Sequence, residues 1–554
     1  MTHARPSARP VADTPSGPVT GTVSGGIASF RGIPYAEPPA GPLRWAPPEP
    51  RKAWSEPLDC SRFGAIAFQS FKKGDIMEPP RGSYRMSEDC LNLNVWTPLE
   101  ALGGGSLPVY VFVHGGGFAA GSSSQPLFGS VRGGGRALYD GSELARKGVV
   151  AVTLNYRLGA LGFLALEESF RRHGTAGNWG ILDQLEALRW VRRNIAAFGG
   201  DPERVTLGGE SAGAVCASLL SVSPLAGGLF RACVSESGTA LSLPGFPVAR
   251  GDMSTAFKLG ASFLSLLGLP RGAGGLAALE RVDAEVLARL SALDIDFRKL
   301  SPMAFFPVAD GKAVPLDPHA ALAAGEVNCR RFMMGFNRDE CSLFLPRERN
   351  PQVLAAVEHC FLGPQGIEAF RAASPPELRE DRARPWHRTR RAMAYALFTA
   401  GTRRFADLCS RHSEVWLYRF DHSPPLMRLA DLGACHVLEL PFVFGSLRLP
   451  GLLSGRGSAG LSRLMCSLWA GFATGGAPVP AGSRHGVQGE GPAGCARSGD
   501  GPPPFSWPAY LGPGGSCAVF SRASRAMPLP DAEGLGIMAD AIFGELPPAE
   551  PAPA

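Results

Sequence analysis

The chain lacks both long apolar runs and a strong excess of charge of either sign. No uninterrupted apolar stretch of about 20 residues occurs, so the sequence predicts no membrane span. The net charge is only +6 over 554 residues, and Lys and Arg form no long run, which argues against a nucleic-acid-binding or membrane-surface protein. No internal repeat is visible, which argues against a solenoid or a propeller. With 45% apolar residues, the composition is that of a soluble globular protein and leaves the function open.

Signals for metal binding and for export are also missing. The twelve cysteines are scattered singly, without a CxxC pair or a Cys/His spacing typical of zinc sites, so no metal centre is predicted. Residues Met1–Thr20 are polar and Pro-rich and lack the apolar stretch of about 7–15 residues that a signal peptide needs. We therefore expect a cytoplasmic protein whose cysteines are reduced and serve as small buried apolar residues.

Short β-branched and aromatic runs alternate with longer helical patterns. The runs that predict strands are Val109–His114, Val149–Asn155, Val205–Leu207, Arg331–Phe336 and Val415–Phe420. The first two are apolar nearly throughout, as expected for parallel strands buried on both faces. Between them and the later strands, Ile181–Phe198 places its apolar residues on one helical stripe. This order predicts an α/β fold, with a large, mostly parallel central sheet flanked by helices on both faces.

No break in composition separates two apolar blocks, so the sequence predicts a single domain over residues 15–545. Residues 475–504 are rich in Gly, Pro and Ser and are interpreted as a surface insertion. Residues 1–14 and 546–554 are predicted to be flexible termini.

The sharpest local signal is a G-x-S-x-G sequence at Gly209–Gly213, centred on Ser211. A chain this rich in glycine is expected to contain roughly 0.7 such matches by chance. Its context raises the significance, because the predicted strand Val205–Leu207 runs into it and the small-residue helical segment Ala212–Leu220 follows. A strand–turn–helix setting is where a nucleophilic serine is held on a tight turn.

A second signal is the run of three glycines that follows His114 at the end of a predicted strand. The N–H groups of such a loop can turn toward a developing negative charge. A plain flexible turn is the alternative, and a phosphate-binding loop is disfavoured because no Walker-type Lys-Ser/Thr accompanies the glycines. His114 itself is interpreted as a residue that shapes the glycine turn.

Taken in order, these segments resemble the carboxylesterase/cholinesterase family of α/β-hydrolases, the type-B carboxylesterases. The family's serine signature is similar to Phe198–Gly213 and its second signature to Glu88–Trp96. Shorter matches are Phe30–Tyr35, Asn155–Gly159 and Gly177–Gly180. The resemblance implies the α/β-hydrolase fold and a serine carboxylesterase activity on small-molecule esters.

The resemblance also implies the remaining catalytic groups. The family's acid lies in a segment similar to Gly335–Glu340, which makes Glu340 the candidate, and its histidine in a segment similar to Gly433–Leu440, which makes His436 the candidate. The order Ser211, Glu340, His436 is the nucleophile–acid–base order of α/β-hydrolases.

The implied mechanism is acyl transfer through Ser211, with His436 as the base and Glu340 as the group that orients it. By the family's pattern, the N–H groups of Gly116, Gly117 and Ala212 form the oxyanion hole. The reaction needs no metal and no organic cofactor.

Neighbouring residues have both a structural and a functional interpretation. Glu210 and Ser237 either polarise the site, as their family counterparts do, or support it structurally. The pairs Arg44–Glu88 and Arg157–Asp183 resemble the family's structural ion pairs. Four aromatic residues either line the substrate gorge or belong to the core: Phe118, Trp179, Phe305 and Phe344.

At two positions the chain departs from the pattern of other family members, and both departures favour a resemblance to bacterial para-nitrobenzyl-esterase-like enzymes. Secreted members pair the cysteine at Cys90 with one about twenty residues earlier, where this chain has Phe68 and Gln69. That disulfide is therefore expected to be absent, unless Cys60 substitutes as the partner of Cys90. Choline-selective members carry a tryptophan where this chain has Pro80, so the cation–π platform for quaternary ammonium is missing.

The alternatives that remain are an amidase, a carbamate hydrolase or a lactonase using the same site, and a non-catalytic binding member of the fold. The sequence does not determine the oligomeric state, monomer or dimer.

Overall fold

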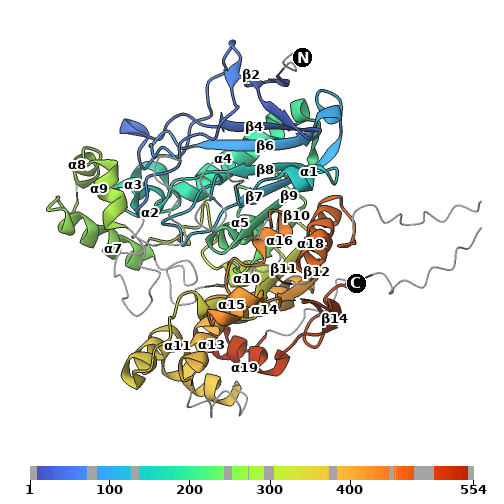
Figure 1. Cartoon of the computed structure of the whole chain (residues 1–554). Coiled ribbons are helices and arrows are strands. Elements are labelled where there is room, and N and C mark those ends of the chain that lie inside the picture. The colour runs from blue at the N-terminus through green and yellow to red at the C-terminus, as the bar shows by residue number, and fades with distance from the viewer. Residues whose placement is uncertain are drawn as a thin grey trace, which may run out of the picture.

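The computed structural model describes residues 9–70, 84–126, 137–242, 253–272, 274–291, 305–373, 384–447, 455, 457–479 and 505–546. A large twisted sheet runs through the molecule, with helices packed on both of its faces (Figure 1). This is the predicted α/β architecture.

The sheet has eleven strands in the order β14-β13-β12-β11-β10-β9-β7-β8-β6-β4-β3. All neighbouring pairs from β8 to β13 are parallel, and the strands added at either edge are antiparallel. The bounds are β3 Thr22–Ser24, β4 Ile27–Pro34, β6 Asn92–Pro98, β7 Leu107–Val113, β8 Val150–Leu154, β9 Gly200–Glu210, β10 Ala232–Glu236, β11 Arg331–Asn337, β12 Glu414–Phe420, β13 Ser516–Phe520 and β14 Arg525–Pro528. All five strands predicted from the sequence are confirmed.

The central strands are apolar throughout because each faces a separate core on either side. Along β7, Val109, Val111 and Val113 belong to one buried cluster. The alternating residues Tyr110 and Phe112 belong to another on the opposite face. Since successive side chains of a strand point to opposite faces, both sets must be apolar to be buried.

Helices cover each of these two cores. One cluster takes side chains from α4 (Trp179–Asn194), α5 (Ala212–Val222), α14 (Ala400–Cys409) and α19 (Ala532–Phe543). The other takes them from α1 (Ser142–Ala145), α16 (Leu440–Val443) and α18 (Ser458–Ala473). The predicted helix 181–198 is α4 followed by a short 3₁₀ turn, Ile195–Phe198.

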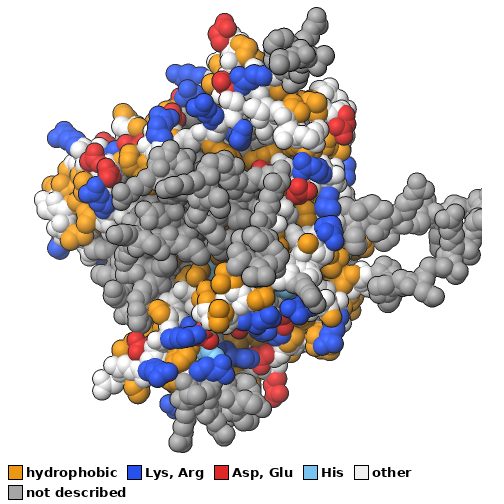
Figure 2. Space-filling view, viewed as in Figure 1, with side chains coloured by type: hydrophobic (Ala, Val, Ile, Leu, Met, Phe, Trp, Pro, Cys, Tyr) orange, Lys and Arg blue, Asp and Glu red, His pale blue; other side chains and the backbone are white. Residues whose placement is uncertain are grey.

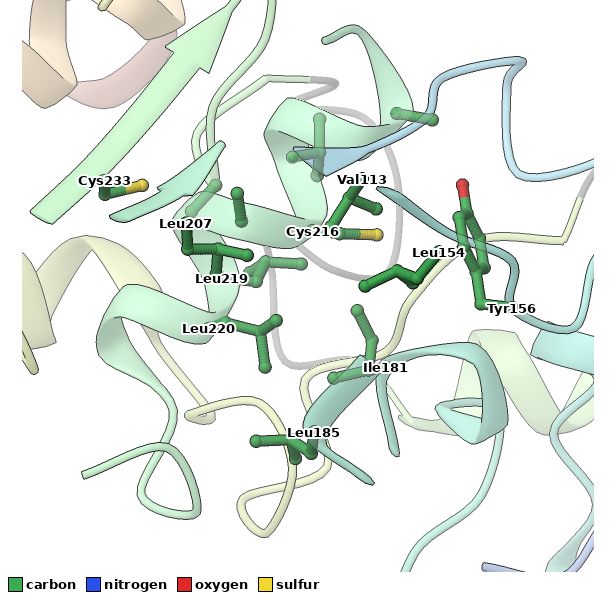
Figure 3. Packing of buried hydrophobic residues seen from close by; sticks show 14 of the residues in the cluster. Val113, Leu154, Tyr156, Ile181, Leu185, Leu207, Cys216, Leu219, Leu220 and Cys233 are labelled. Atoms are coloured by element: carbon green, nitrogen blue, oxygen red, sulfur yellow. The ribbon is translucent and has the colours of Figure 1, made fainter. Parts of the chain in front are cut away.

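Helix α5 is packed tightly against the sheet, which matters because it follows the candidate nucleophile. Figure 3 shows Cys216, Leu219 and Leu220 of this helix among side chains of the sheet and of α4, including Leu207 and Ile181. Every residue of α5 is buried, so the helix is held as part of the core.

The N-terminal boundary differs from the prediction. Val11–Thr14, assigned from sequence to a flexible terminus, form strand β1, which pairs antiparallel with β2 (Gly17–Thr20). The prediction was wrong there because alternate residues of β1 are buried, which a Pro-rich composition does not reveal. Residues 1–8, most of the proposed insertion (480–504) and residues 547–554 lie outside the described part.

The two ion pairs suggested by the resemblance are present. Arg157 and Asp183 are fully buried and joined at 2.6 Å, and Arg44 and Glu88 are joined at the same distance. A buried ion pair of this kind is costly to break, because removing one partner leaves the other charge unpaired.

The eleven described cysteines are all free thiols, Cys60 and Cys90 included. In the same part of the chain, no helix has the length and apolar character needed to cross a membrane.

Candidate active site

Ser211 lies on a sharp turn between the end of β9 and the start of α5. Its backbone has φ 57° and ψ −125°, a region that residues other than glycine rarely occupy. Its N–H donates to the carbonyl of Glu236 on the neighbouring strand β10, at 2.8 Å. Such strain persists only where surrounding structure holds it, and it is found at functional sites.

The two glycines of the motif are required by close backbone contacts. A Cβ on Gly209 would lie 2.2 Å from the carbonyl oxygen of Gly213, and one on Gly213 would lie 2.1 Å from that of Val113. The turn can therefore be this tight only with glycine at both positions.

The glycine loop after β7 lies directly against this turn. A Cβ on Gly115 would be 2.9 Å from the Cβ of Ser211, so only hydrogen fits between loop and serine. Gly116 and Gly117 have φ of 113° and 61°. Among the described residues, none accepts a hydrogen bond from the N–H groups of Gly116, Gly117 or Ala212. These donors remain available to a ligand.

His114, which precedes the loop, makes contacts that support the loop structurally. Its Nδ1 lies 2.8 Å from the carbonyl oxygen of Gly115, and its ring stacks on Tyr156. Burial lowers the pKa of His114 to about 4, so the ring is neutral and supports the glycine turn, as the sequence suggested.

Glu340 and His436 meet beyond the carboxyl ends of β11 and β12. His436 Nδ1 lies 2.6 Å from Glu340 Oε2, and both side chains are buried. The other carboxylate oxygen, Oε1, accepts the N–H of Asn337 at 2.7 Å. Both oxygens of Glu340 are thus held, and the imidazole is oriented through its Nδ1.

The opposite nitrogen of His436 faces the serine turn. Its Nε2 lies 3.1 Å from Oε1 of Glu210, the residue that precedes Ser211. Burial would by itself lower the pKa of His436, but the carboxylates of Glu210 and Glu340 outweigh it and raise that pKa to about 9. Burial raises the pKa of Glu210 well above its usual value, and the charge of His436 partly offsets that rise.

Two further buried acids lie near this group and were not found from the sequence. Glu236 accepts the indole N–H of Trp469 at 3.2 Å, and Glu439 accepts the side-chain amide of Asn337. Burial raises the pKa of Glu236 well above its usual value and that of Glu439 to about 7. The only feature of the sequence that could have pointed to these acids is that Glu439 lies three residues after His436.

Ser237, on the adjoining turn, has a buried hydroxyl without a described partner.

Of the four aromatic candidates, only Phe344 is placed beside the catalytic candidates. Its ring centroid lies 5.1 Å from that of His436, and Phe398, which sequence reasoning missed, lies 4.7 Å from His436 on a π-helical turn (Tyr395–Thr399). The ring of Phe398 is the nearer of the two.

The other three aromatic residues pack in the core. Phe118 makes edge contacts with Phe163 and Phe306, and Phe305 makes one with Phe263. Trp179 is fully buried, and its indole N–H donates to the Leu164 carbonyl at 3.2 Å. A substrate contact for these three stays a prediction. Pro80 lies outside the described residues.

No described cluster of three or more His, Cys, Asp or Glu is arranged to hold a metal ion. The site combines a serine on a strand–turn–helix unit with an imidazole, a carboxylate and free N–H donors. This combination, at the carboxyl ends of a mostly parallel sheet, defines an α/β-hydrolase.

Comparison with known proteins is consistent with that class. Residues 8–490 match the model of the carboxylesterase family, so the chain belongs to the carboxylesterase family and is an ester hydrolase. It is 36% identical to the para-nitrobenzyl esterase of Bacillus subtilis over 79% of this chain and 83% of that protein. It is 34% identical to the human cocaine esterase, over 86% of each.

Solved structures of the family have the same fold. A thermophilic para-nitrobenzyl esterase, 31% identical, superposes with a TM-score of 0.76 over 96% of this chain and 100% of that one. A carboxylesterase of Geobacillus stearothermophilus, 33% identical, gives 0.75 over 95% and 99%.

Proposed function

We propose that the protein is a serine carboxylesterase that works through Ser211, His436 and Glu340 and an acyl-enzyme intermediate. The observation that carries this proposal is the 2.6 Å contact between His436 Nδ1 and Glu340, with Nε2 of the same ring turned toward the residue beside Ser211. A hydroxyl is a poor nucleophile at its own pKa, so a base at this place is what ester cleavage requires.

In the first half-reaction, neutral His436 takes the proton of Ser211 while Oγ attacks the ester carbonyl. The free N–H groups of Gly116, Gly117 and Ala212 receive the negative charge of the tetrahedral oxygen. The imidazolium, stabilised by Glu340, then protonates the leaving alcohol. Water repeats the sequence on the acyl-enzyme, so the acid product is released and Ser211 is regenerated.

The substrates that we propose are uncharged carboxylic esters of varied size. The similar proteins carry names that refer to different esters, such as para-nitrobenzyl esterase and cocaine esterase, so membership of the family does not select one substrate. Phe344 and Phe398 beside His436 would provide an apolar wall for the ester.

A hydrolysis panel tests this function. We expect p-nitrophenyl acetate and butyrate to be hydrolysed well, and acetylthiocholine and p-nitroacetanilide poorly, because an anilide leaves less readily and no choline platform is expected. An organophosphate should label the peptide that contains Ser211, detected by mass spectrometry. Faster hydrolysis of the anilide than of the esters would favour an amidase, and labelling only at another residue would refute the proposed nucleophile.

The pH dependence follows from the carboxylates around His436. The base must be neutral, so kcat/KM should rise as the pH passes upward through the pKa of His436, which lies at about 9 rather than at the 6–7 of a free imidazole. Glu210→Gln removes one of the two carboxylates and should move the midpoint of a pH–rate profile to lower pH. A midpoint that is the same in both proteins would contradict this role of Glu210.

A further inference from the structure

A cavity of about 440 Å³ lies beside the triad candidate Glu340, outside the reaction described above. Its walls come from the turn after β11, from α13 (Trp386–Ala394), from α15 (Pro425–Leu429) and from the start of α19. Lys and Arg side chains gather on the face of the molecule that carries α13 and α15 (Figure 2).

The lining of this cavity carries more basic than acidic side chains. Four acidic residues, Glu340 among them, are outnumbered by six arginines: Arg338, Arg384, Arg390, Arg391, Arg419 and Arg428. Glu340 is buried and bonded to His436, so it contributes little to the open side of the cavity. Four of the six arginines are paired with an aspartate, Arg419 with Asp421 outside the cavity, and a small surplus of positive charge remains.

Asp431, which also lines the cavity, is stabilised as a carboxylate by its neighbours. Burial would raise its pKa, but hydrogen bonds from Trp386 and His387 and the charge of Arg390 lower it to about 2. A carboxylate is therefore strongly stabilised at this place.

The aspartates occupy only part of each guanidinium. Arg390 donates from Nε to the carbonyl of Leu345 at 2.8 Å and from Nη1 to Asp431 at 3.0 Å, and its Nη2 has no described acceptor. Arg391 uses Nε and Nη2 on Tyr395 and Asp531, which leaves its Nη1. An arginine has five N–H donors, so each of these two guanidinium groups keeps N–H donors that no described residue uses.

Arg428 is the clearest case of an unpaired positive charge in the cavity. It is exposed on α15 and lines the cavity, and no described residue accepts a hydrogen bond from it or pairs with its charge. A guanidinium without an acid, beside others with free donors, is an arrangement that suits phosphate or carboxylate oxygens.

We propose that this cavity is a second binding site, distinct from the ester site, for a small anion that carries two or more oxyanion groups. A carboxylate is planar and a phosphate is tetrahedral, but each presents a pair of oxygens that can bind to the edge of a guanidinium. Several separate guanidinium groups favour a ligand that carries more than one phosphate or carboxylate. The volume of the cavity is within the range of small-molecule sites.

Calorimetric titration of the full-length protein tests this site, with pyrophosphate and citrate as separate probes at matched ionic strength. We expect at least one probe to bind. Arg428→Glu should weaken that binding by at least tenfold, because it removes an unpaired positive charge and adds a negative one. The matched control is Arg463→Glu on α18, which also changes an exposed, unpaired arginine, but away from the cavity, and should bind as the wild type does.

The outcome separates the possible ligands. Binding of pyrophosphate alone indicates a phosphate-bearing ligand, and binding of citrate alone indicates a polycarboxylate. Hydrolysis of p-nitrophenyl acetate by both variants at the wild-type rate shows that they are folded, since neither arginine belongs to the ester site. If the wild type binds neither probe at millimolar concentration, or if both variants lose binding equally, the proposal is wrong.

Discussion

Ser211→Ala is expected to lower kcat for p-nitrophenyl acetate by about 10⁴-fold or more, because no other hydroxyl lies on the strained turn beside the free N–H donors. The proposed oxyanion donors are all backbone groups, so they survive the substitution. The remaining rate should therefore still exceed that in buffer. Initial rates with the purified variant measure the effect.

Ser221→Ala is the matched control. Ser221 is buried on the same helix, α5, and its hydroxyl donates only to the Ser218 carbonyl, at 2.6 Å. Loss of that bond should cost about 1 kcal/mol of stability and leave kcat unchanged. An activity of Ser211→Ala close to that of Ser221→Ala would remove Ser211 from the mechanism.

Glu340→Gln should lower kcat by about 10⁴-fold although it changes the side chain by a single atom. Oε1 of Glu340 accepts the N–H of Asn337 at 2.7 Å, so the glutamine must place its carbonyl oxygen there. Its NH₂ group then faces His436 Nδ1, where the carboxylate oxygen lies at 2.6 Å in the parent. Nδ1 is forced to accept, the ring proton moves to Nε2, and the imidazole no longer takes a proton from Ser211.

The structure offers a control for the loss of a buried carboxylate. Glu358, 8% exposed, accepts a hydrogen bond from the Thr389 hydroxyl at 2.8 Å. Glu358→Gln should destabilise the protein modestly without changing kcat. Glu340→Asp keeps the charge and should recover part of the activity lost in Glu340→Gln. Equal rates for Glu340→Gln and the parent would exclude the proposed orientation of the ring.

The features that could be predicted depend on residues close together in the chain. The apolar runs at β7 and β8 identified buried parallel strands, and the motif around Ser211 identified a strand–turn–helix unit. The resemblance to a family supplied Glu340 and His436, which lie 96 positions apart and share no local pattern. Phe118 and Trp179 illustrate the limit, because an aromatic residue near a motif has the same local signature in a core as in a substrate site.

By itself, the sequence determined the α/β class and the position of the serine turn, since hydrophobic period and glycine placement act over a few residues. Only the tertiary structure decided which distant groups surround the imidazole. Glu236 contacts Trp469, 233 positions later, and the basic cavity combines residues of several separate elements, among them β11, α13, α15 and α19. The physical reason is that the parallel register of the sheet brings strand ends together, and the charge and burial that set the pKa of His436 arise only from that assembly.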